Sequence, residues 1–279
     1  MQTRFDITID RSDPAVACDA LTRRTGLSKS KVKQAMIKGA VWLQRPGERP
    51  RRIRRATMIV HIGDRLALYH DPTILELRPP AAHCLRDHSQ YSIWFKPAGL
   101  MTQGTRFGDH CALSRQVEHH FGGKRKVYVV HRLDREASGL LIVAHTRSAA
   151  AHLSRMLRNH AIEKSYRICV RGDLSHFRRS GHIDFILDEK AAHTEYEVIR
   201  YLEETDHTLV RVRLRTGRLH QIRRHMDMIG FPVIGDPRYG QNNKNTAGLQ
   251  LVADSLAFDC PFGKGRVAVT IDPEGIQPL

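Results

Sequence analysis

The sequence predicts an α+β protein whose larger part is a mixed, mainly antiparallel sheet. From Ile93 onward, short β-branched segments alternate with a few helical ones, without the regular rhythm of βαβ units. A helix pair opens the chain instead, and the polar segment 79–90, which contains two prolines, separates the two regions. We therefore expect a small α/β domain over residues 1–78 and a larger domain over 91–279, joined by a linker at 79–90.

Two helices are predicted within residues 15–39. Ser28 has the side chain of a helix N-cap, and Leu27 and Val32 flank it at the spacing of a hydrophobic staple. Gly39 suits the left-handed position that closes a helix. The second helix should therefore run from Ser28 to Gly39, with its lysines facing outward.

The later elements follow from apolar spacing and from turn residues. We expect short strands at 41–43 and 65–69 in the small domain, with an apolar stretch at 58–60 between them. In the larger domain we expect strands at 139–144, 166–170, 196–199 and 209–214, and helices at 148–159 and 219–228.

The chain is strongly basic. It holds 45 lysines and arginines against 29 acidic residues, a formal net charge of +16. Half of this excess falls in residues 1–80, and a second arginine cluster lies between residues 211 and 224. Two basic regions indicate an extended polyanionic partner, RNA or DNA, because lysine and arginine pair with phosphates.

Other classes of protein are disfavoured. No apolar run approaches the roughly 20 residues that a membrane helix needs, and the first residues lack the apolar core of a signal peptide. The five cysteines form no CxxC pair, so we expect reduced thiols and a cytoplasmic protein. His220 and His225 are five residues apart, off one helical face, and no HExxH pattern occurs, so we expect no metal site.

Asp134 is the strongest single candidate for a site. It stands between Arg132 and Arg135, directly before the apolar run 139–144, so it can project from a rigid platform. The alternative is a surface aspartate in an ion pair with one of these two arginines. Spacing alone favours that alternative.

Four motifs follow one another along the chain: Lys96–Leu100, His131–Asp134 followed by Ser138–Leu140, Lys164–Arg167, and Thr216–Met226, which continues into Pro232–Gly240. Over about residues 90–262, their order and spacing resemble the RluA family of RNA pseudouridine synthases. The resemblance implies a pseudouridine synthase fold and an isomerase that converts uridine to pseudouridine in RNA without a cofactor.

The resemblance also implies roles for individual residues. Asp134 would be the catalytic carboxylate, attacking the sugar or the base or abstracting a proton. Arg223 matches the arginine that pairs with it and keeps it ionised. Tyr166 matches the aromatic residue that stacks on the flipped base, and Arg132 the residue that helps displace the target nucleotide. Neither His131 nor His220 is expected to be catalytic.

Two positions depart from the family pattern. Ala137 stands where a threonine is usual, and Val252 replaces a histidine. We expect slightly looser support of the Asp134 loop from the first change, with activity retained.

Residues 1–78 resemble the alpha-L RNA-binding module first recognised in a ribosomal protein. This favours ribosomal RNA as the substrate, with transfer RNA as the alternative. Besides Arg132, the RNA-binding candidates across the chain are the basic residues Lys29, Lys31, Lys33, Arg51, Arg52, Arg218 and Arg224.

Two other functions remain to be weighed. A retaining glycosidase needs a second carboxylate beside Asp134, and Glu136 is a poor candidate because it need not face the same cleft. A catalytically silent RNA-binding or ribosome-assembly protein is harder to exclude, because binding and catalysis would share the basic surface.

Overall fold

The computed structural model describes residues 2–245, 247–263 and 265–272, and the chain forms two compact units. The N-terminal unit comprises residues 1–79 and 103–123, and the C-terminal unit comprises 80–102 and 124–279. Residues 83–87, inside the expected linker, form a strand of the C-terminal unit. No sequence signal indicated that 103–123 would belong to the N-terminal unit. The domain boundaries at 78 and 91 stay a prediction.

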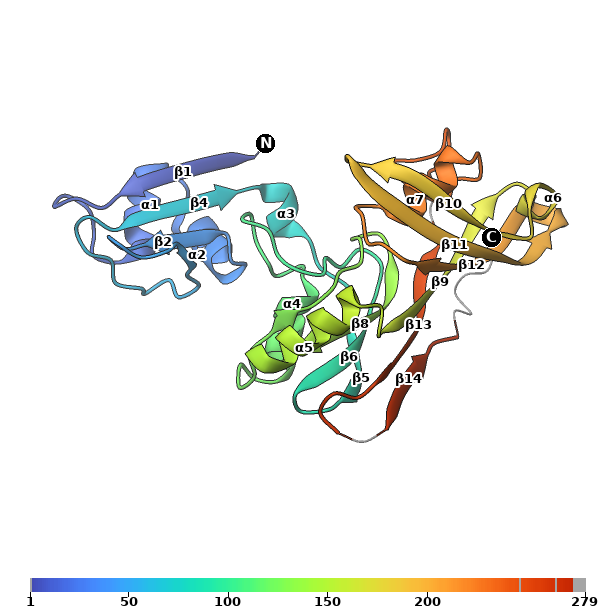
Figure 1. Ribbon diagram of the computed structural model, residues 1–279. Helices are drawn as coiled ribbons and strands as arrows, with labels where there is room; N and C mark the ends of the chain where they lie inside the picture. The colour runs from blue at the N-terminus through green and yellow to red at the C-terminus, as the bar shows by residue number, and fades with distance from the viewer. Residues whose placement is uncertain (1, 246, 264, 273–279) are drawn as a thin grey trace. The chain divides into compact units, whose positions relative to one another are not determined.

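The N-terminal unit is a four-stranded antiparallel sheet in the order β1-β4-β2-β3, with helices α1 and α2 packed on it (Figure 1). Its elements are β1 (Thr3–Thr8), α1 (Ala17–Thr25), α2 (Lys29–Ile37), β2 (Val41–Gln44), β3 (Arg51–Arg52), β4 (Arg65–His70), α3 (Pro72–Glu76) and α4 (Leu113–His120).

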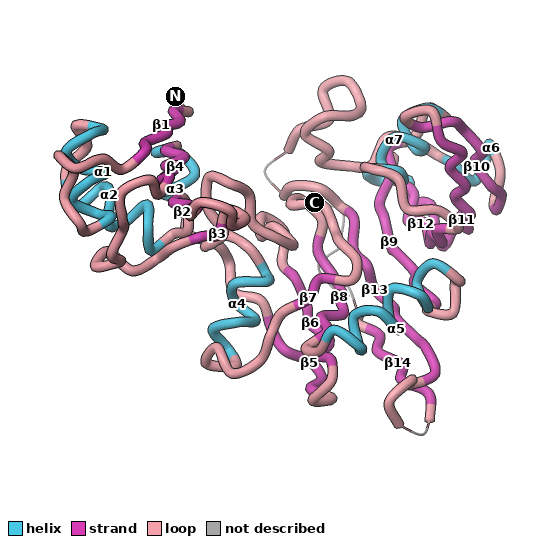
Figure 2. Tube along the Cα trace, turned by 60° about the vertical axis from the view of Figure 1, so that its left-hand side comes forward, coloured by secondary structure: helices cyan, strands magenta, loops and turns pink. Residues whose placement is uncertain are grey.

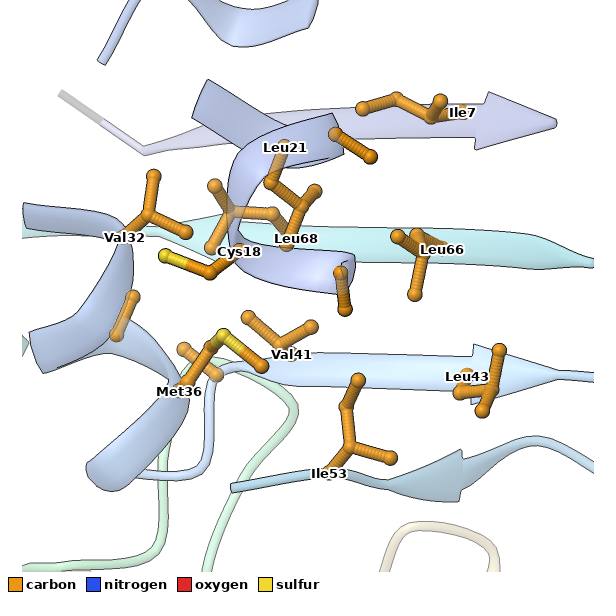
Figure 3. Packing of buried hydrophobic residues seen from close by; sticks show 14 of the residues in the cluster. Ile7, Cys18, Leu21, Val32, Met36, Val41, Leu43, Ile53, Leu66 and Leu68 are labelled. Atoms are coloured by element: carbon orange, nitrogen blue, oxygen red, sulfur yellow. The ribbon is translucent and has the colours of Figure 1, made fainter. Parts of the chain in front are cut away.

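The core of this unit lies between the helix pair and the sheet. Leu21 of α1 and Met36 of α2 meet Val41 and Leu68 of the strands, and all four are fully buried (Figure 3). The predicted helix ends are confirmed: the Ser28 hydroxyl caps α2, and Gly39 follows it with φ +77°.

The C-terminal unit is built on a ten-stranded sheet whose main path is β10-β11-β12-β9-β13-β8-β6-β5. Among the described residues its pairs are antiparallel except β13 with β8, so the predicted mixed, mainly antiparallel sheet is confirmed. Its strands are β5 (His83–Asp87), β6 (Tyr91–Lys96), β7 (Tyr128–Val129), β8 (Ser138–Ala144), β9 (Glu163–Arg171), β10 (Ser180–Leu187), β11 (Lys190–Leu202), β12 (His207–Leu214), β13 (Leu251–Asp259) and β14 (Arg266–Thr270). Its helices are α5 (Arg147–Arg158), α6 (Leu174–Phe177), the 3-10 turn η1 (Glu203–Thr205) and α7 (Gln221–Met228).

Helix α5 covers the part of the sheet that includes β8, and α7 packs against β10 and β11 (Figure 1). Strand β8 is buried from Gly139 to Ala144, as its sequence predicts. Leu140 of β8, Leu153 of α5 and Phe258 of β13 belong to one apolar core. Among the described residues, no helix combines the length and the apolar character that crossing a membrane requires.

The prediction that the last helix begins at Leu219 is wrong by two residues. His220 has φ +52°, which no interior helical residue adopts, and α7 starts at Gln221. The Gln221 amide oxygen accepts hydrogen bonds from Thr216 Oγ1 (2.8 Å) and from the Arg218 backbone nitrogen (2.9 Å). These bonds close a turn where apolar spacing alone predicted helix. After α7 the chain runs as a loop to β13 (Figure 2).

Strands β8 and β13 approach each other closely where their parallel pairing begins. Val252 is opposite Ser138, and Ala253 is opposite Gly139. A Cβ atom on Gly139 would lie 2.5 Å from the Ala253 backbone nitrogen, so this position excludes a side chain. Strand β8 directly follows the Asp134 loop. Its contact with β13 therefore fixes the position of the end of that loop.

Replacing Gly139 by alanine should lower the free energy of unfolding by about 1–3 kcal/mol, since the new methyl group would overpack the β8–β13 contact. The φ of +119° at Gly139 adds backbone strain. Urea denaturation followed by circular dichroism measures the change. Gly263→Ala is the control, because its Cβ would meet only the Cys260 sulfur at 3.9 Å, and it should change stability by less than about 0.5 kcal/mol. Equal stability of the two variants would contradict the close approach.

Candidate active site

A cavity of about 810 Å³ lies within the C-terminal unit. Its walls come from the loop 130–134, from β9, from the stretch 214–223 and from the end of α5. These segments are far apart in the sequence, and each contains one of the motifs or borders one. Five of the predicted site residues line this cavity: Arg132, Asp134, Tyr166, Arg218 and Arg223.

Asp134 is paired with Arg223, not with its sequence neighbours Arg132 and Arg135. Arg223 Nη1 donates to Asp134 Oδ2 at 3.0 Å. The Arg223 side chain is 1% exposed and that of Asp134 is 17% exposed, so the carboxylate sits at the cavity wall while the guanidinium lies behind it.

A second carboxylate holds the other edge of Arg223. Its Nε donates to Asp236 Oδ2 at 2.6 Å and its Nη2 to Asp236 Oδ1 at 2.8 Å, and the Asp236 side chain has no exposed surface. The Tyr239 ring centroid lies 5.3 Å from the guanidinium carbon. Burial opposes the charge of Arg223, but hydrogen bonds to Asp236 and Asp134 outweigh it and raise the pKa of Arg223. The guanidinium therefore remains a permanent cation.

Asp236 is the site residue that sequence reasoning missed. Its Oδ1 also accepts the backbone nitrogens of Arg238 (2.8 Å) and Tyr239 (3.1 Å), which fixes the turn after Gly235. It lies in the motif 232–240, but no role was assigned to it. A buried arginine beside one carboxylate needs further acceptors for its five donors. The need for a second acceptor of Arg223 is the signal that could have pointed to Asp236.

Lys96 anchors the Asp134 loop from the other side. Its buried ammonium group donates to the carbonyl oxygens of Leu100 (2.7 Å) and Ala137 (2.6 Å), among others. Burial lowers the pKa of Lys96 to about 8, although the carboxylates of Asp134 and Glu136 oppose the shift. Because the backbone carbonyl of Ala137 makes this contact, the missing threonine hydroxyl is not needed for it.

The start of the same loop is held by a hydroxyl. Thr102 Oγ1 donates to the Leu133 carbonyl at 2.8 Å and accepts from the Leu133 nitrogen at 3.1 Å. The Gly99 nitrogen donates to the Arg135 carbonyl at 2.7 Å. The backbone on both sides of Asp134 is thus fixed.

Tyr166 lies on β9 with its ring at the cavity and is 6% exposed. Burial, and then the nearby Asp134 charge, raise the pKa of Tyr166 to about 12. Its hydroxyl is therefore a neutral phenol at physiological pH, able to donate a hydrogen bond.

The two motif histidines make structural contacts. His131 is half-buried, its desolvation lowers its pKa well below the usual value, and its Nε2 accepts a hydrogen bond from the Ile142 backbone nitrogen at 3.0 Å. His220 Nδ1 lies 3.1 Å from the Tyr239 hydroxyl, while its Nε2 is 3.8 Å from Asp134 Oδ2. Burial likewise lowers the pKa of His220.

The RNA-binding candidates fall into two groups. In the C-terminal unit, Arg132 and Arg218 line the cavity, whereas Arg224 pairs with Asp188 at 2.9 Å. In the N-terminal unit, three exposed candidates form no ion pair with the described residues: Lys31, Lys33 and Arg51.

The other two candidates in the N-terminal unit already have partners there. Lys29 pairs with Asp19 at 2.6 Å. Arg52 pairs with Asp109 and lies 4.6 Å from the centre of the Trp42 ring. Within the described parts of the chain, no group of histidine, cysteine and acidic side chains has the arrangement of a metal site.

The chain is similar to several proteins named as RNA pseudouridine synthases. The profile of the family described as RNA pseudouridylate synthase matches residues 90–228. The tRNA pseudouridine synthase C of Pasteurella multocida is 31% identical over 213 residues, which cover 62% of this chain and 84% of that protein.

The ribosomal large subunit pseudouridine synthase D of Zymomonas mobilis is 34% identical over 186 residues, which cover 58% of this chain and 56% of the relative. Among solved structures, human RNA pseudouridylate synthase domain containing 1 matches with a TM-score of 0.59 and 22% identity. The match covers 71% of this chain and 87% of that one, and it supports the fold alone.

The chain therefore belongs to the RNA pseudouridylate synthases. The RluA-family assignment made from its motifs is confirmed. So is the predicted enzyme class, an isomerase that converts uridine to pseudouridine in RNA.

Asp236→Ala should lower the free energy of unfolding by about 3–5 kcal/mol, because it leaves a buried guanidinium with one edge unpaired. The exposed pair of Glu197 and Arg211, 3.1 Å apart on neighbouring strands, provides the control. Glu197→Ala should cost less than about 1 kcal/mol. Urea denaturation at neutral pH compares the two variants. An equal loss of unfolding free energy would show that Asp236 does not stabilise the buried charge of Arg223.

Proposed function

We propose that this enzyme modifies a uridine in ribosomal RNA with Asp134 as its catalytic carboxylate. One observation carries the proposal: Asp134 reaches the cavity while its far side is held by Arg223, which is itself locked by Asp236. An aspartate in a surface ion pair would not be oriented from behind by a fully buried cation. The arrangement leaves one carboxylate oxygen, Oδ1, for a substrate.

The charge of Asp134 suits chemistry that uses no cofactor. Attack on the sugar, attack on the base and abstraction of a proton all need an ionised carboxylate aimed at the bound nucleotide. Arg223 favours the ionised form and also fixes its direction. The backbone on both sides of Asp134 is already fixed in the free protein. Little conformational entropy of this loop is therefore lost when the nucleotide binds.

Tyr166 and Arg132 complete the proposed site. The Tyr166 ring lies on the same cavity as Asp134, where it can stack on a flipped base while its neutral hydroxyl faces the proton to be removed. Arg132 is exposed at the cavity, two residues before Asp134. It is placed to fill the position that the target nucleotide leaves when it is extruded from its helix.

The choice of ribosomal RNA is supported by the N-terminal unit. Its sequence resembles the alpha-L module, its helix pair packs on a small sheet, and α2 exposes Lys31 and Lys33. We propose that this unit binds structured RNA through these lysines and Arg51. The relatives include both ribosomal RNA and transfer RNA enzymes, so transfer RNA is the second candidate. An RNA substrate and five free cysteines favour the cytoplasm as its location.

Asp134→Asn should abolish pseudouridine formation while RNA binding survives, because the amide keeps the shape but not the charge of the carboxylate. Unmodified ribosomal and transfer RNA would be incubated with each protein, and pseudouridine would be mapped by chemical labelling and sequencing. Glu136→Gln is the matched control: its carboxylate lies 3.6 Å from the same Arg223 Nη1, and it should retain product.

The same experiment separates the alternatives. Product in transfer RNA alone would replace the ribosomal substrate. If Glu136→Gln abolished the reaction as completely as Asp134→Asn, a two-carboxylate mechanism would be favoured. If no protein formed product on RNA that all of them bind, the catalytic role of Asp134 would be withdrawn.

Tyr166→Phe should lower the rate by about 10²-fold or more if the hydroxyl assists proton transfer. Since the pKa of Tyr166 is raised to about 12, its phenol stays protonated throughout pH 7–10, and the substitution should leave the shape of the pH–rate profile unchanged there. Initial rates measured across this range test both statements. A basic limb present in the wild type and absent from Tyr166→Phe would show that the tyrosine ionises.

A further inference from the structure

Lys164 is a cation of the cavity that the proposed catalytic arrangement does not use. It lies on β9 two residues before Tyr166, and alternate residues of a strand share one face. Both side chains line the cavity. Lys164 therefore faces the space in which the target nucleotide would lie.

Lys164 has no partner among the described residues: no hydrogen bond and no ion pair involves its ammonium group. Burial lowers the pKa of Lys164, and no carboxylate opposes the shift. Lys96 is also desolvated, but it donates to several carbonyl oxygens. The Lys164 side chain is only partly buried, so its ammonium group meets the open space of the cavity instead of a protein acceptor.

The other lysine and arginine side chains of the cavity either have protein partners or are exposed to solvent. Arg223 pairs with Asp134 and Asp236, and Arg215 donates to Glu195 at 2.8 Å. Among the described residues that line the cavity, Asp134 is the single acid, and its Oδ2 accepts a hydrogen bond from Arg223. No ion pair joins Lys164 to this carboxylate in the described part of the chain, so a bound anion can supply its counter-charge.

We propose that Lys164 binds a backbone phosphate of the RNA beside the target uridine. This inference rests on the proposed function, in which the cavity receives a nucleotide. The uracil base and the ribose are uncharged, so the phosphate is the group of the substrate that complements an ammonium ion. A phosphate held at Lys164 would orient its nucleotide relative to Tyr166 on the same strand face and to Asp134 across the cavity. Arg158, at the end of α5, lines the same cavity and adds positive charge to the site.

Lys164→Met tests the assignment because it keeps the length of the side chain and removes the charge. We expect the KM for RNA to rise about tenfold while kcat changes less than threefold. Lys164→Arg should restore most of the affinity. The control is Lys190→Met, which removes an exposed lysine of β11 outside the cavity lining and should change KM less than twofold.

Binding can be measured without catalysis, in proteins that also carry Asp134→Asn. Loss of one phosphate contact should reduce the slope of log K against log salt concentration by about 1 for Lys164→Met. Lys190→Met should leave the slope within error. Because this assay needs no turnover, it judges Lys164 even if Asp134 proves not to be catalytic.

Stability provides an independent readout. Because no hydrogen bond or ion pair of the described residues involves the Lys164 ammonium group, its substitution should leave the Tm of the free protein nearly unchanged, whereas the loss of a lysine with a structural role would lower the Tm. If Lys164→Met does not fold, Lys164→Gln takes its place in every assay. An unchanged salt slope together with an unchanged KM would overturn the proposal, as would a fall in kcat with KM unaltered.

Discussion

The pairing of Arg223 with Asp134 and Asp236 is the interaction on which the site depends. A fully buried guanidinium costs several kcal/mol in lost hydration, and only good geometry and several acceptors offset that cost. Two carboxylates supply them at 2.6–3.0 Å. Asp236 comes from the loop before β13 and Asp134 from the loop before β8, so one side chain of α7 joins three segments. The Asp134 carboxylate at the cavity is therefore oriented by a buried guanidinium that Asp236 holds in place.

Backbone contacts keep the Asp134 loop where this pairing needs it. The Thr102 hydroxyl fixes the loop at Leu133, and the Lys96 ammonium group fixes it at Ala137. Gly139 then allows β8 to approach β13 closely enough for parallel pairing to begin. A substitution far from Asp134 in the sequence can therefore displace its carboxylate.

Two buried cations and one partly buried cation near this loop differ in how their charges are balanced. Arg223 keeps its charge through carboxylates, and Lys96 is stabilised by carbonyl dipoles although burial lowers its pKa to about 8. Within the described ranges, Lys164 has neither kind of partner. The first two stabilise the loop of the free protein, whereas the third is left available for a phosphate of the substrate. This contrast distinguishes structural lysine and arginine from substrate-binding lysine more clearly than sequence position does.

Local patterns in the sequence determined much of the fold. The Ser28 cap, the buried run of β8 and the helix α5 follow from side-chain chemistry and apolar spacing over a few residues. The motifs were sufficient for the family and for nominating Asp134, Tyr166 and Arg223. The start of α7 was misplaced because Gln221 bonds to the preceding turn. Only the tertiary structure brought Asp236 to Arg223, placed residues 103–123 in the N-terminal unit and left Lys164 without a partner. These features depend on contacts between segments distant in the chain, and neither propensity nor periodicity encodes which distant charges will meet.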